Sequence, residues 1–136
     1  MPLIFRSMTV DADKKPKTGS TGRTLGVRTD EIPVDDDGRV LPETGGMSVS
    51  PNWRALAPWR IPKRLSSKSP GACGKNADEC WRHGSGAFEI GPVNAQLFLR
   101  PNDTSHGLVE PAHEMSIAEY RSALELTRDD WVIDED

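Results

Sequence analysis

The chain has 136 residues, 35% of them hydrophobic, with a mean hydropathy of -0.57 and a formal net charge of -4, which predicts one small, loop-rich domain over residues 1–136. Its 11 prolines and 12 glycines disfavour long uninterrupted helices. No run approaches the roughly 20 apolar residues that cross a bilayer, and residues 3–5 are too short for the apolar core of a signal peptide.

The charge is distributed unevenly along the chain. Residues 44–77 contain six basic residues and no acidic one, whereas residues 129–136 are strongly acidic. The basic segment would attract phosphates or an acidic partner, or the two segments could screen each other in the fold. The six basic residues are Arg54, Arg60, Lys63, Arg64, Lys68 and Lys75.

The first third of the chain predicts short strands separated by loops. Residues 3–10 alternate in a composition that favours a strand, which carries Arg6. Residues 11–22 are rich in Lys, Gly, Ser and Thr and predict a mobile loop, and residues 24–28 predict a short strand. The three aspartates of residues 35–37, followed by Gly38, indicate a solvated tight turn, and their spacing lacks the calcium-loop pattern.

The middle of the chain predicts further strands around an irregular segment. Residues 47–50 predict a strand, which Pro51 ends. In residues 53–65, Pro58 and Pro62 restrict the chain to a short helical turn and extended pieces. Two more strands are predicted at residues 96–99 and 107–110.

A helix near the C-terminus has the clearest local signals. Ser116 and Glu119 form a capping box, and Met115 can pack against Tyr120 as a hydrophobic staple. The predicted fold class is therefore α+β, with strands predominating and one reliable helix that packs on the core. The residues that share its buried face at helical spacing are Ile117, Tyr120, Leu124 and Thr127.

One constellation of residues suits a cofactor that carries phosphates. Arg6 lies on the first predicted strand, and a guanidinium offers a planar, bidentate fork to a pyrophosphate. About forty residues later, Gly45 and Gly46 lead into a strand whose alternation places Ser48 and Ser50 on one face. The glycines allow a ligand to approach the backbone closely, or they form a simple turn.

Three segments of the sequence resemble the ADP-ribosyltransferase superfamily, most closely the exported-effector-two branch of the type VI secretion toxins. They are Phe-Arg-Ser at residues 5–7, Pro-Glu-Thr-Gly-Gly-Met-Ser-Val at 42–49 and His-Gly-Leu-Val-Glu-Pro-Ala at 106–112. Together the three segments span most of the chain. Residues 51–80 have no counterpart in the bacterial toxin.

The resemblance implies a split β-sheet cleft that holds NAD in a bent shape, with few short helices and one C-terminal helix. It implies that Arg6 contacts the phosphates of NAD and that Ser48 supports the nicotinamide ribose and the catalytic glutamate. The residues expected to bind the cofactor are Arg6, Ser7, Thr44, Gly45, Gly46, Ser48, Ser50 and His106.

A carboxylate is also needed, because positive charge grows on the ribose as its bond to nicotinamide stretches. Glu110 is the candidate, at the end of a predicted strand, and Glu114 is the reserve. The toxin branch keeps no plain glutamate at this position, so Glu110 rests on the wider superfamily. His106 could serve as a polar cofactor contact or a proton carrier.

The function that this resemblance implies is an NAD-dependent ADP-ribosyltransferase toxin. Its acceptor would be a protein or a nucleic acid in the cytoplasm of a recipient cell, or water in an NAD glycohydrolase reaction. The resemblance further implies antibacterial delivery by a secretion system without a signal peptide. It also implies a cognate immunity protein that covers the cleft.

Two other classes of function stay open. A non-catalytic protein could bind nucleic acid or an acidic partner through the basic, Trp-containing residues of segment 53–68. A nuclease could use His83, His106 and His113, although no metal spacing supports it. Zinc is not expected, because six residues separate Cys73 from Cys80, outside the usual spacing of paired ligands. The residues of the binding alternative are Trp53, Arg54, Trp59, Arg60, Lys63 and Arg64.

Overall fold

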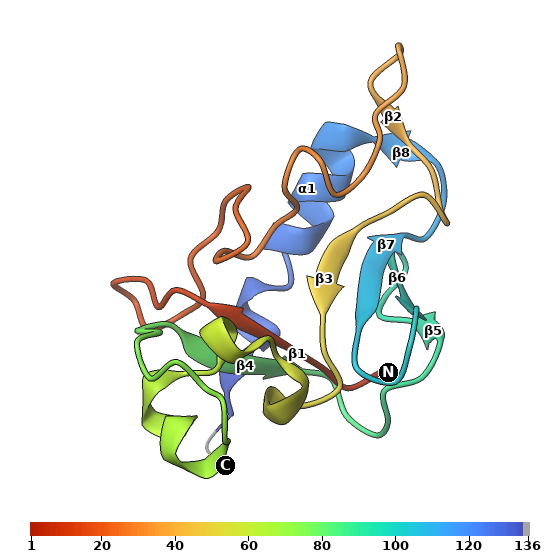
Figure 1. The fold of residues 1–136 in the computed structure, drawn as a ribbon. Helices are drawn as coiled ribbons and strands as arrows, with labels where there is room; N and C mark the ends of the chain where they lie inside the picture. The colour runs from red at the N-terminus through yellow and green to blue at the C-terminus, as the bar shows by residue number, and fades with distance from the viewer. Residues whose placement is uncertain (135–136) are drawn as a thin grey trace.

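The computed structural model describes residues 1–134, which form short antiparallel strands and one α-helix in a mixed α+β fold (Figure 1). The predicted fold class is thereby confirmed at this level. The strands form a three-stranded sheet, a four-stranded sheet and a two-stranded ribbon, and the ribbon joins the start of the helix to an earlier loop. Within residues 1–134, no helix is both long enough and apolar enough to span a membrane.

The three-stranded sheet has the order β1-β4-β9. Its strands are β1 (Ile4–Met8), β4 (Glu79–His83) and β9 (Val132–Ile133), and Arg6 pairs with Trp81 in the antiparallel register. All five residues of β1 are buried, although its sequence alternates. Both faces of the strand are covered, so alternation here does not separate a core face from a solvent face.

The four-stranded sheet has the order β3-β7-β6-β5. Its strands are β3 (Met47–Val49), β7 (Gly107–Pro111), β6 (Leu97–Pro101) and β5 (Gly91–Pro92). The three strands predicted at residues 47–50, 96–99 and 107–110 are therefore confirmed. The pairing of β3 with β7 brings two of the three segments that carry the family resemblance side by side.

The two sheets join where β1 meets the end of β3. Phe5 and Ser50 form an isolated antiparallel bridge in which each backbone N–H donates to the other residue's carbonyl, both at 2.8 Å. The side chain of Arg6 adds a third link, because its Nη1 donates to the Ser48 carbonyl at 2.7 Å. The first two predicted motifs therefore meet at the junction of the sheets.

The C-terminal helix α1 (Ile117–Glu125) begins as predicted. Ser116 Oγ accepts from the backbone N–H of Glu119 at 3.0 Å, and the Glu119 side chain accepts from the N–H of Ser116 at 3.1 Å. Tyr120 is fully buried and fastens the helix to the four-stranded sheet. Its hydroxyl donates to the Val109 carbonyl of β7 and accepts from the Met47 N–H of β3.

The two-stranded ribbon pairs β2 (Arg39–Val40) with β8 (Met115–Ser116), immediately before α1. The turn predicted at residues 35–38 is present, with the Gly38 N–H donating to the Asp35 carbonyl. Its outgoing strand pairs with β8, which lies about 75 residues further along the chain.

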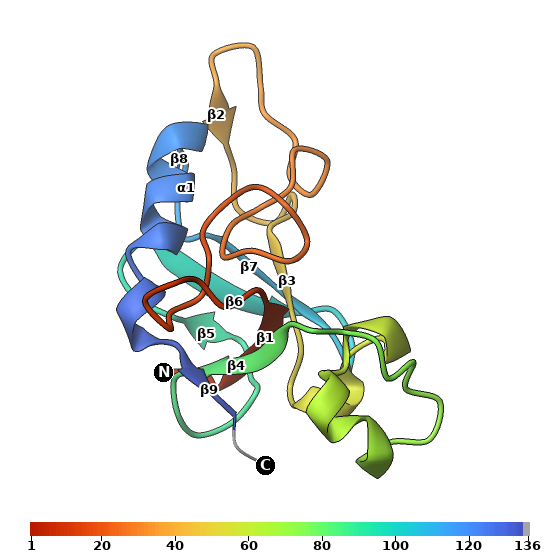
Figure 2. The same cartoon turned by 90° about the vertical axis from the view of Figure 1, so that its left-hand side faces the viewer.

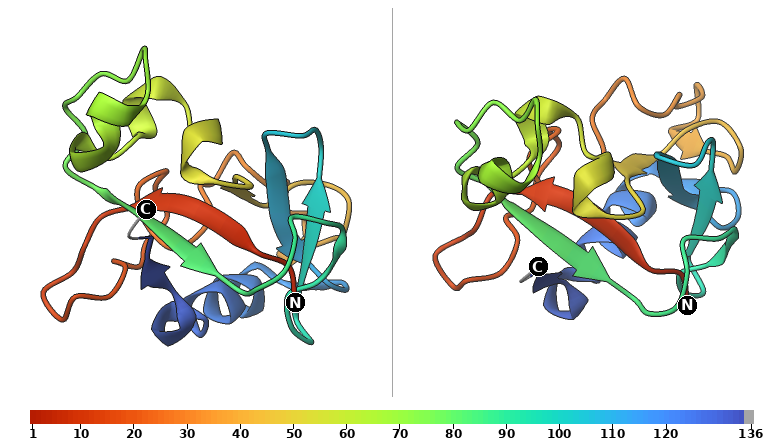
Figure 3. Two further views of the ribbon diagram at one scale, coloured as in Figure 1. Left: turned by 90° about the horizontal axis from the view of Figure 1, so that it is seen from below. Right: turned by 60° about the horizontal axis from the view of Figure 1, so that its bottom comes forward.

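The segment after β3 forms three 3₁₀ helices, whereas its prolines predict one short helical turn and extended pieces: η1 (Trp53–Ala55), η2 (Pro58–Arg60) and η3 (Lys63–Lys68). These turns and α1 lie on opposite sides of the sheets (Figures 2 and 3). Beneath the turns is a second hydrophobic cluster, separate from the main core. Its buried members are Phe5, Trp53, Ile61, Leu65 and Cys80.

Several predictions from local sequence were wrong or incomplete. Residues 24–28 form no strand, because only Leu25 makes an isolated bridge, to Thr18. Strand β4 was not predicted, and neither was β9, which lies in the acidic tail after the turn η4 (Arg128–Asp130). Residues 135–136 of that tail lie outside the described residues.

Candidate functional site

A cleft of about 350 Å³ lies at the junction of β1 and β3. Its walls come from β1, the end of β3, the loop before β2 and the turns η1 and η2. The lining therefore combines segments that are distant in the sequence. The side chains that line it are Phe5, Arg6, Ser7, Arg28, Glu31, Ser48, Val49, Ser50, Leu56, Ala57, Trp59, Arg60 and His106, together with Gly22.

Arg6 is buried at the base of this cleft, with 5% of the residue exposed. Its guanidinium donates to four backbone carbonyls, those of Ser48 in β3 and of Thr21, Thr24 and Gly26 in the adjacent loop. Burial lowers the pKa of Arg6 to about 10, while the nearby Glu31 charge acts in the opposite sense. The guanidinium is therefore still charged at neutral pH, and its hydrogen bonds hold together the backbone segments that form the cleft.

Among the described residues, the cleft is lined by one carboxylate, that of Glu31. Ser48 Oγ donates to Glu31 Oε2 at 2.9 Å, and the backbone N–H of Arg28 donates to Oε1 at 2.8 Å. The Arg28 side chain is half exposed, and its Nε lies 3.4 Å from the same Oε1. The Glu31 side chain is itself only 8% exposed. A strand serine thus holds a buried carboxylate in a fixed position inside the cleft.

Gly45 and Gly46 make this arrangement possible. A Cβ atom at Gly45, where φ is +154°, would lie 2.1 Å from the Glu31 carbonyl oxygen, and one at Gly46 would lie 2.4 Å from the Val109 carbonyl oxygen. The Gly46 N–H also donates to the Glu31 carbonyl at 3.0 Å. The close approach that these glycines permit is that of the Glu31 backbone and of strand β7.

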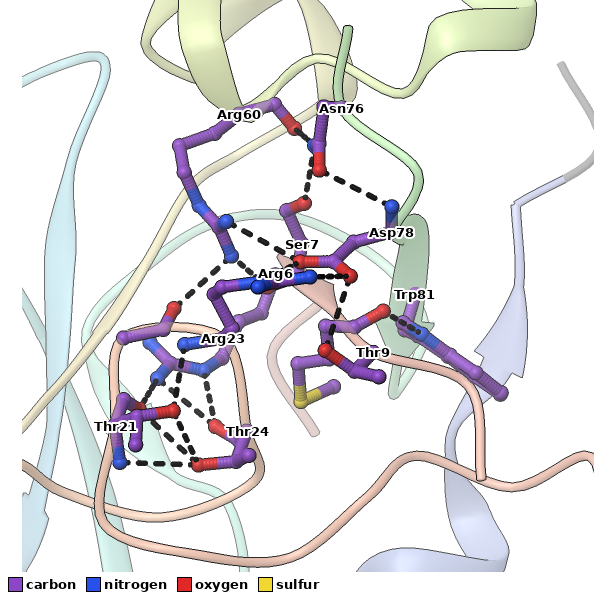
Figure 4. Close-up of polar contacts among 12 residues, drawn as sticks. Arg6, Ser7, Thr9, Thr21, Arg23, Thr24, Arg60, Asn76, Asp78 and Trp81 are labelled. Carbon is purple, nitrogen blue, oxygen red and sulfur yellow. Dashed lines mark hydrogen bonds and ion pairs between the residues drawn. The ribbon is translucent and has the colours of Figure 1, made fainter. Parts of the chain in front are cut away.

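Arg60 enters the cleft from η2 and is held by a network around Asp78 (Figure 4). Its Nη2 donates to the carbonyls of Ser7 and Gly22 at 2.6 and 3.0 Å, and its Nη1 lies 3.3 Å from Asp78 Oδ2. Asp78 also accepts two hydrogen bonds from Arg23. The network joins β1, the loop at residue 22 and η2, so it holds the wall of the cleft.

The residues predicted to bind the cofactor divide into two groups. Five of them line the cleft: Arg6, Ser7, Ser48, Ser50 and His106. The other three, Thr44, Gly45 and Gly46, do not line it, and the Thr44 hydroxyl donates to the Leu41 carbonyl at the exposed surface. The structure therefore brings together residues from β1, from β3 and the position just after it, and from the position just before β7.

Glu110, the predicted catalytic carboxylate, lies outside this lining. It is buried in β7 and forms a bidentate ion pair with Arg100 of β6, with Arg100 Nε 3.1 and 3.2 Å from its two oxygens. The reserve candidate, Glu114, is exposed and lies 3.8 Å from Arg39. Neither carboxylate shares the cleft with Ser48, whereas Glu31 does.

Sequence reasoning missed Glu31, Arg28 and Arg60 as cleft residues. Glu31 lies in a loop without strand or helix periodicity. Its only local signal is the pair with Arg28 three residues earlier. Arg60 was noted as part of the basic segment, but its position in the cleft depends on Asp78, which is 18 residues away.

Several basic side chains of residues 44–77 form ion pairs and hydrogen bonds within the fold. Arg60 pairs with Asp78, and Arg64 pairs with Glu79 at 2.8 Å and also donates to the Asp134 carbonyl. Trp53 is buried and stacks against the guanidinium of Arg54. These contacts leave fewer side chains for the binding surface that the sequence suggests.

The remaining candidates for chemistry are dispersed. His106 lines the cleft and bonds to Asn102, His83 is buried against Trp131, and His113 is exposed. Cys80 is buried, which raises the pKa of its thiol to about 12, while Cys73 is exposed. In residues 1–134, no three of the His, Cys, Asp and Glu side chains cluster as metal ligands.

Comparison with known protein families, curated proteins and solved structures finds no match to this chain.

Proposed function

We propose that the cleft binds NAD and transfers its ADP-ribose to a macromolecule, or to water, with release of nicotinamide. The observation that carries this proposal is the Glu31 carboxylate, held by the Ser48 hydroxyl in a cleft that three arginines also line. The resemblance of residues 5–7, 42–49 and 106–112 to ADP-ribosyltransferases supports the same reaction.

The arginines suit the diphosphate of NAD. Arg6, Arg28 and Arg60 reach the cleft from three separate segments, and Glu31 is the only carboxylate in the described lining. The formal charge of this lining is therefore positive, which favours an anion. Arg6 is only 5% exposed, whereas the side chains of Arg28 and Arg60 are 53% and 20% exposed, so we assign Arg28 and Arg60 to the phosphates.

Glu31 suits the reacting end of the substrate. As the bond between ribose C1 and the nicotinamide nitrogen breaks, its electron pair leaves with neutral nicotinamide, and positive charge develops on the ribose. A fixed carboxylate that accepts a hydrogen bond from a ribose hydroxyl stabilises this charge. The acceptor's oxygen or nitrogen then forms the new bond to C1 and releases its proton to solvent. We therefore assign the catalytic role to Glu31, with Ser48 as its positioning residue.

The proposal extends to a toxin that acts in a recipient cell and is restrained by an immunity protein. This part rests on the family resemblance. Depletion of NAD would stop growth whatever the acceptor is. A partner that covered the cleft would block both NAD and acceptor.

The proposal is tested by expressing the chain in a bacterium under an inducible promoter and measuring cellular NAD and growth. We expect the wild type to lower both. Glu31→Gln and Ser48→Ala should restore them at equal protein levels. Glu125→Gln, an exposed position on α1 outside the cleft, is the matched control and should remain as toxic as the wild type. Unchanged NAD levels on wild-type expression would contradict the proposal.

A further inference from the structure

Trp59 is the exposed tryptophan of this chain, and it lines the cleft. Its residue is 66% exposed, whereas Trp53, Trp81 and Trp131 are 2%, 1% and 2% exposed. Single exposed apolar residues are common on protein surfaces and need no explanation by themselves. Trp59 differs because no other large, exposed hydrophobic residue in the described chain lines this cleft.

The turn that carries Trp59 is firmly held. Pro58 fixes the first position of η2, and its carbonyl accepts from the Cys73 N–H at 3.3 Å. The next residue, Arg60, donates through its side chain to the Ser7 and Gly22 carbonyls. The backbone under the indole is therefore anchored on both sides. A ligand that packs on the indole would therefore have to order only the side chain of Trp59 and not the turn that carries it.

The surroundings of Trp59 indicate what such a ligand is. Arg28 and Arg60 line the same cleft, and Leu56 and Ala57 add apolar surface. A flat aromatic surface beside guanidinium groups matches a nucleotide, whose base stacks while its phosphates bind the cations. An acidic peptide would use the cations, but its carboxylate side chains offer no flat ring to stack on the indole.

We propose that the exposed indole of Trp59 is a stacking platform for the heteroaromatic base of a nucleotide. This proposal rests on the proposed function in one respect only, namely the identity of the nucleotide that supplies the base. The base belongs either to NAD itself or to a single-stranded nucleic acid that accepts the ADP-ribose. Both sources present the same ring chemistry, and binding experiments separate them.

The experiment measures dissociation constants for wild type, Trp59→Ala and Trp59→Phe with three probes. They are pyrophosphate, ADP-ribose and a single-stranded RNA of about 12 nucleotides, which is within the length that such sites cover. Leu126→Ala removes an exposed apolar side chain outside the cleft and is the matched control. Because the other tryptophans are buried, acrylamide quenches mainly the fluorescence of Trp59 in the wild type. A base stacked on the indole should reduce this quenching.

We expect Trp59→Ala to weaken binding of one base-containing probe about tenfold, as loss of one stacked base does. Trp59→Phe should retain most of the affinity, and pyrophosphate binding should not change. A loss for ADP-ribose assigns the base to NAD, and a loss confined to RNA assigns it to the acceptor. Changes below twofold for both probes, or no binding of either to the wild type, would overturn the proposal. Failure to release nicotinamide from NAD would overturn the proposed function alone, since the RNA measurement still decides the stacking proposal.

Discussion

The hydroxyl of Ser48 donates a 2.9 Å hydrogen bond to the carboxylate of Glu31, and this pair joins two segments that the sequence separates by 17 residues. Ser48 is itself fixed from behind, because its carbonyl accepts from the buried guanidinium of Arg6. The three side chains form a chain of contacts from β1 through β3 to the loop before β2. The proposed chemistry depends on this chain of contacts.

Removing the charge of Glu31 should abolish most of the activity and leave the fold intact. Glu31→Gln keeps the size of the side chain and can still accept from Ser48, but it cannot stabilise positive charge on the ribose. We expect the rate of nicotinamide release to fall on the order of 100-fold or more. The measurement is steady-state kinetics, with a thermal melt to verify folding. Activity within a few-fold of the wild type would remove Glu31 from the mechanism.

Glu110 should prove more important for stability than for chemistry. Its carboxylate is buried and receives two hydrogen bonds from Arg100 Nε, so Glu110→Gln weakens an ion pair inside the four-stranded sheet. Because the Arg100 side chain is 35% exposed, we expect a loss of about 1–3 kcal/mol in the free energy of unfolding. Chemical denaturation measures this loss. A large drop in nicotinamide release at unchanged stability would instead return the catalytic role to Glu110.

The sequence predicted those parts of the fold whose signals are local. The capping box of Ser116 and Glu119 marked the start of α1, and Pro51 marked the end of β3. Strand β4 was missed because its pairing with β1 joins residues more than 70 positions apart. Strand β9 was missed because its two residues, Val132 and Ile133, lie between acidic residues that indicate solvent exposure.

The candidate site was predicted only in part, because some of its residues have local sequence signals and others do not. Arg6 and Ser48 were identified from their strands and from the family resemblance, and both line the cleft. Glu31 was not, because its position results from the close contact of its backbone with Gly45, which only the folded chain reveals. The two glycines carry this signal, but their sequence pattern fits equally the approach of a ligand or a simple turn.

Asp78 should be a main determinant of the cleft wall. Its side chain is 2% exposed and lies between Arg23 and Arg60, so Asp78→Asn leaves both arginines without a counter-charge. Arg23 is mostly exposed and Arg60 partly so, and we therefore expect a loss of about 2–3 kcal/mol at neutral pH. The same variant should weaken pyrophosphate binding, because Arg60 loses its support. Equal stability of variant and wild type would contradict this role.

The contribution of Asp78 should disappear in acid. Burial alone would raise the pKa of Asp78, but hydrogen bonds from Arg23 and Thr9 and the charges of both arginines leave it below the ordinary 3.8. The folded state therefore binds this proton less readily than the unfolded chain, and stability falls as the pH drops below 3.8. Denaturation of wild type and Asp78→Asn from neutral pH downward should give curves that converge in that range. A constant difference would show that the charge of Asp78 is not the cause.

His83 should make stability sensitive to mildly acidic pH. Burial lowers the pKa of His83, although Asp130, 4.0 Å from Nε2, partly opposes this, and Nδ1 has no partner among the described residues. The folded state thus favours the neutral ring, so stability is complete above the ordinary pKa of 6.5 and declines as the pH falls below it. His83→Phe should flatten the dependence between about pH 7 and pH 5. The exposed His113→Gln, as control, should retain it, and an unchanged slope in His83→Phe would exclude His83 as the source.

The most direct test of the central claim is whether the purified chain releases nicotinamide from NAD. The reaction is followed by chromatography, with Glu31→Gln and Glu125→Gln measured in parallel at equal concentration. We predict that the wild type and Glu125→Gln release nicotinamide and ADP-ribose in equal amounts when water is the acceptor, and that Glu31→Gln does so at a rate lower by two orders of magnitude or more. Absence of nicotinamide release from the folded wild type, both alone and with a cell extract as the source of acceptor, would contradict the account.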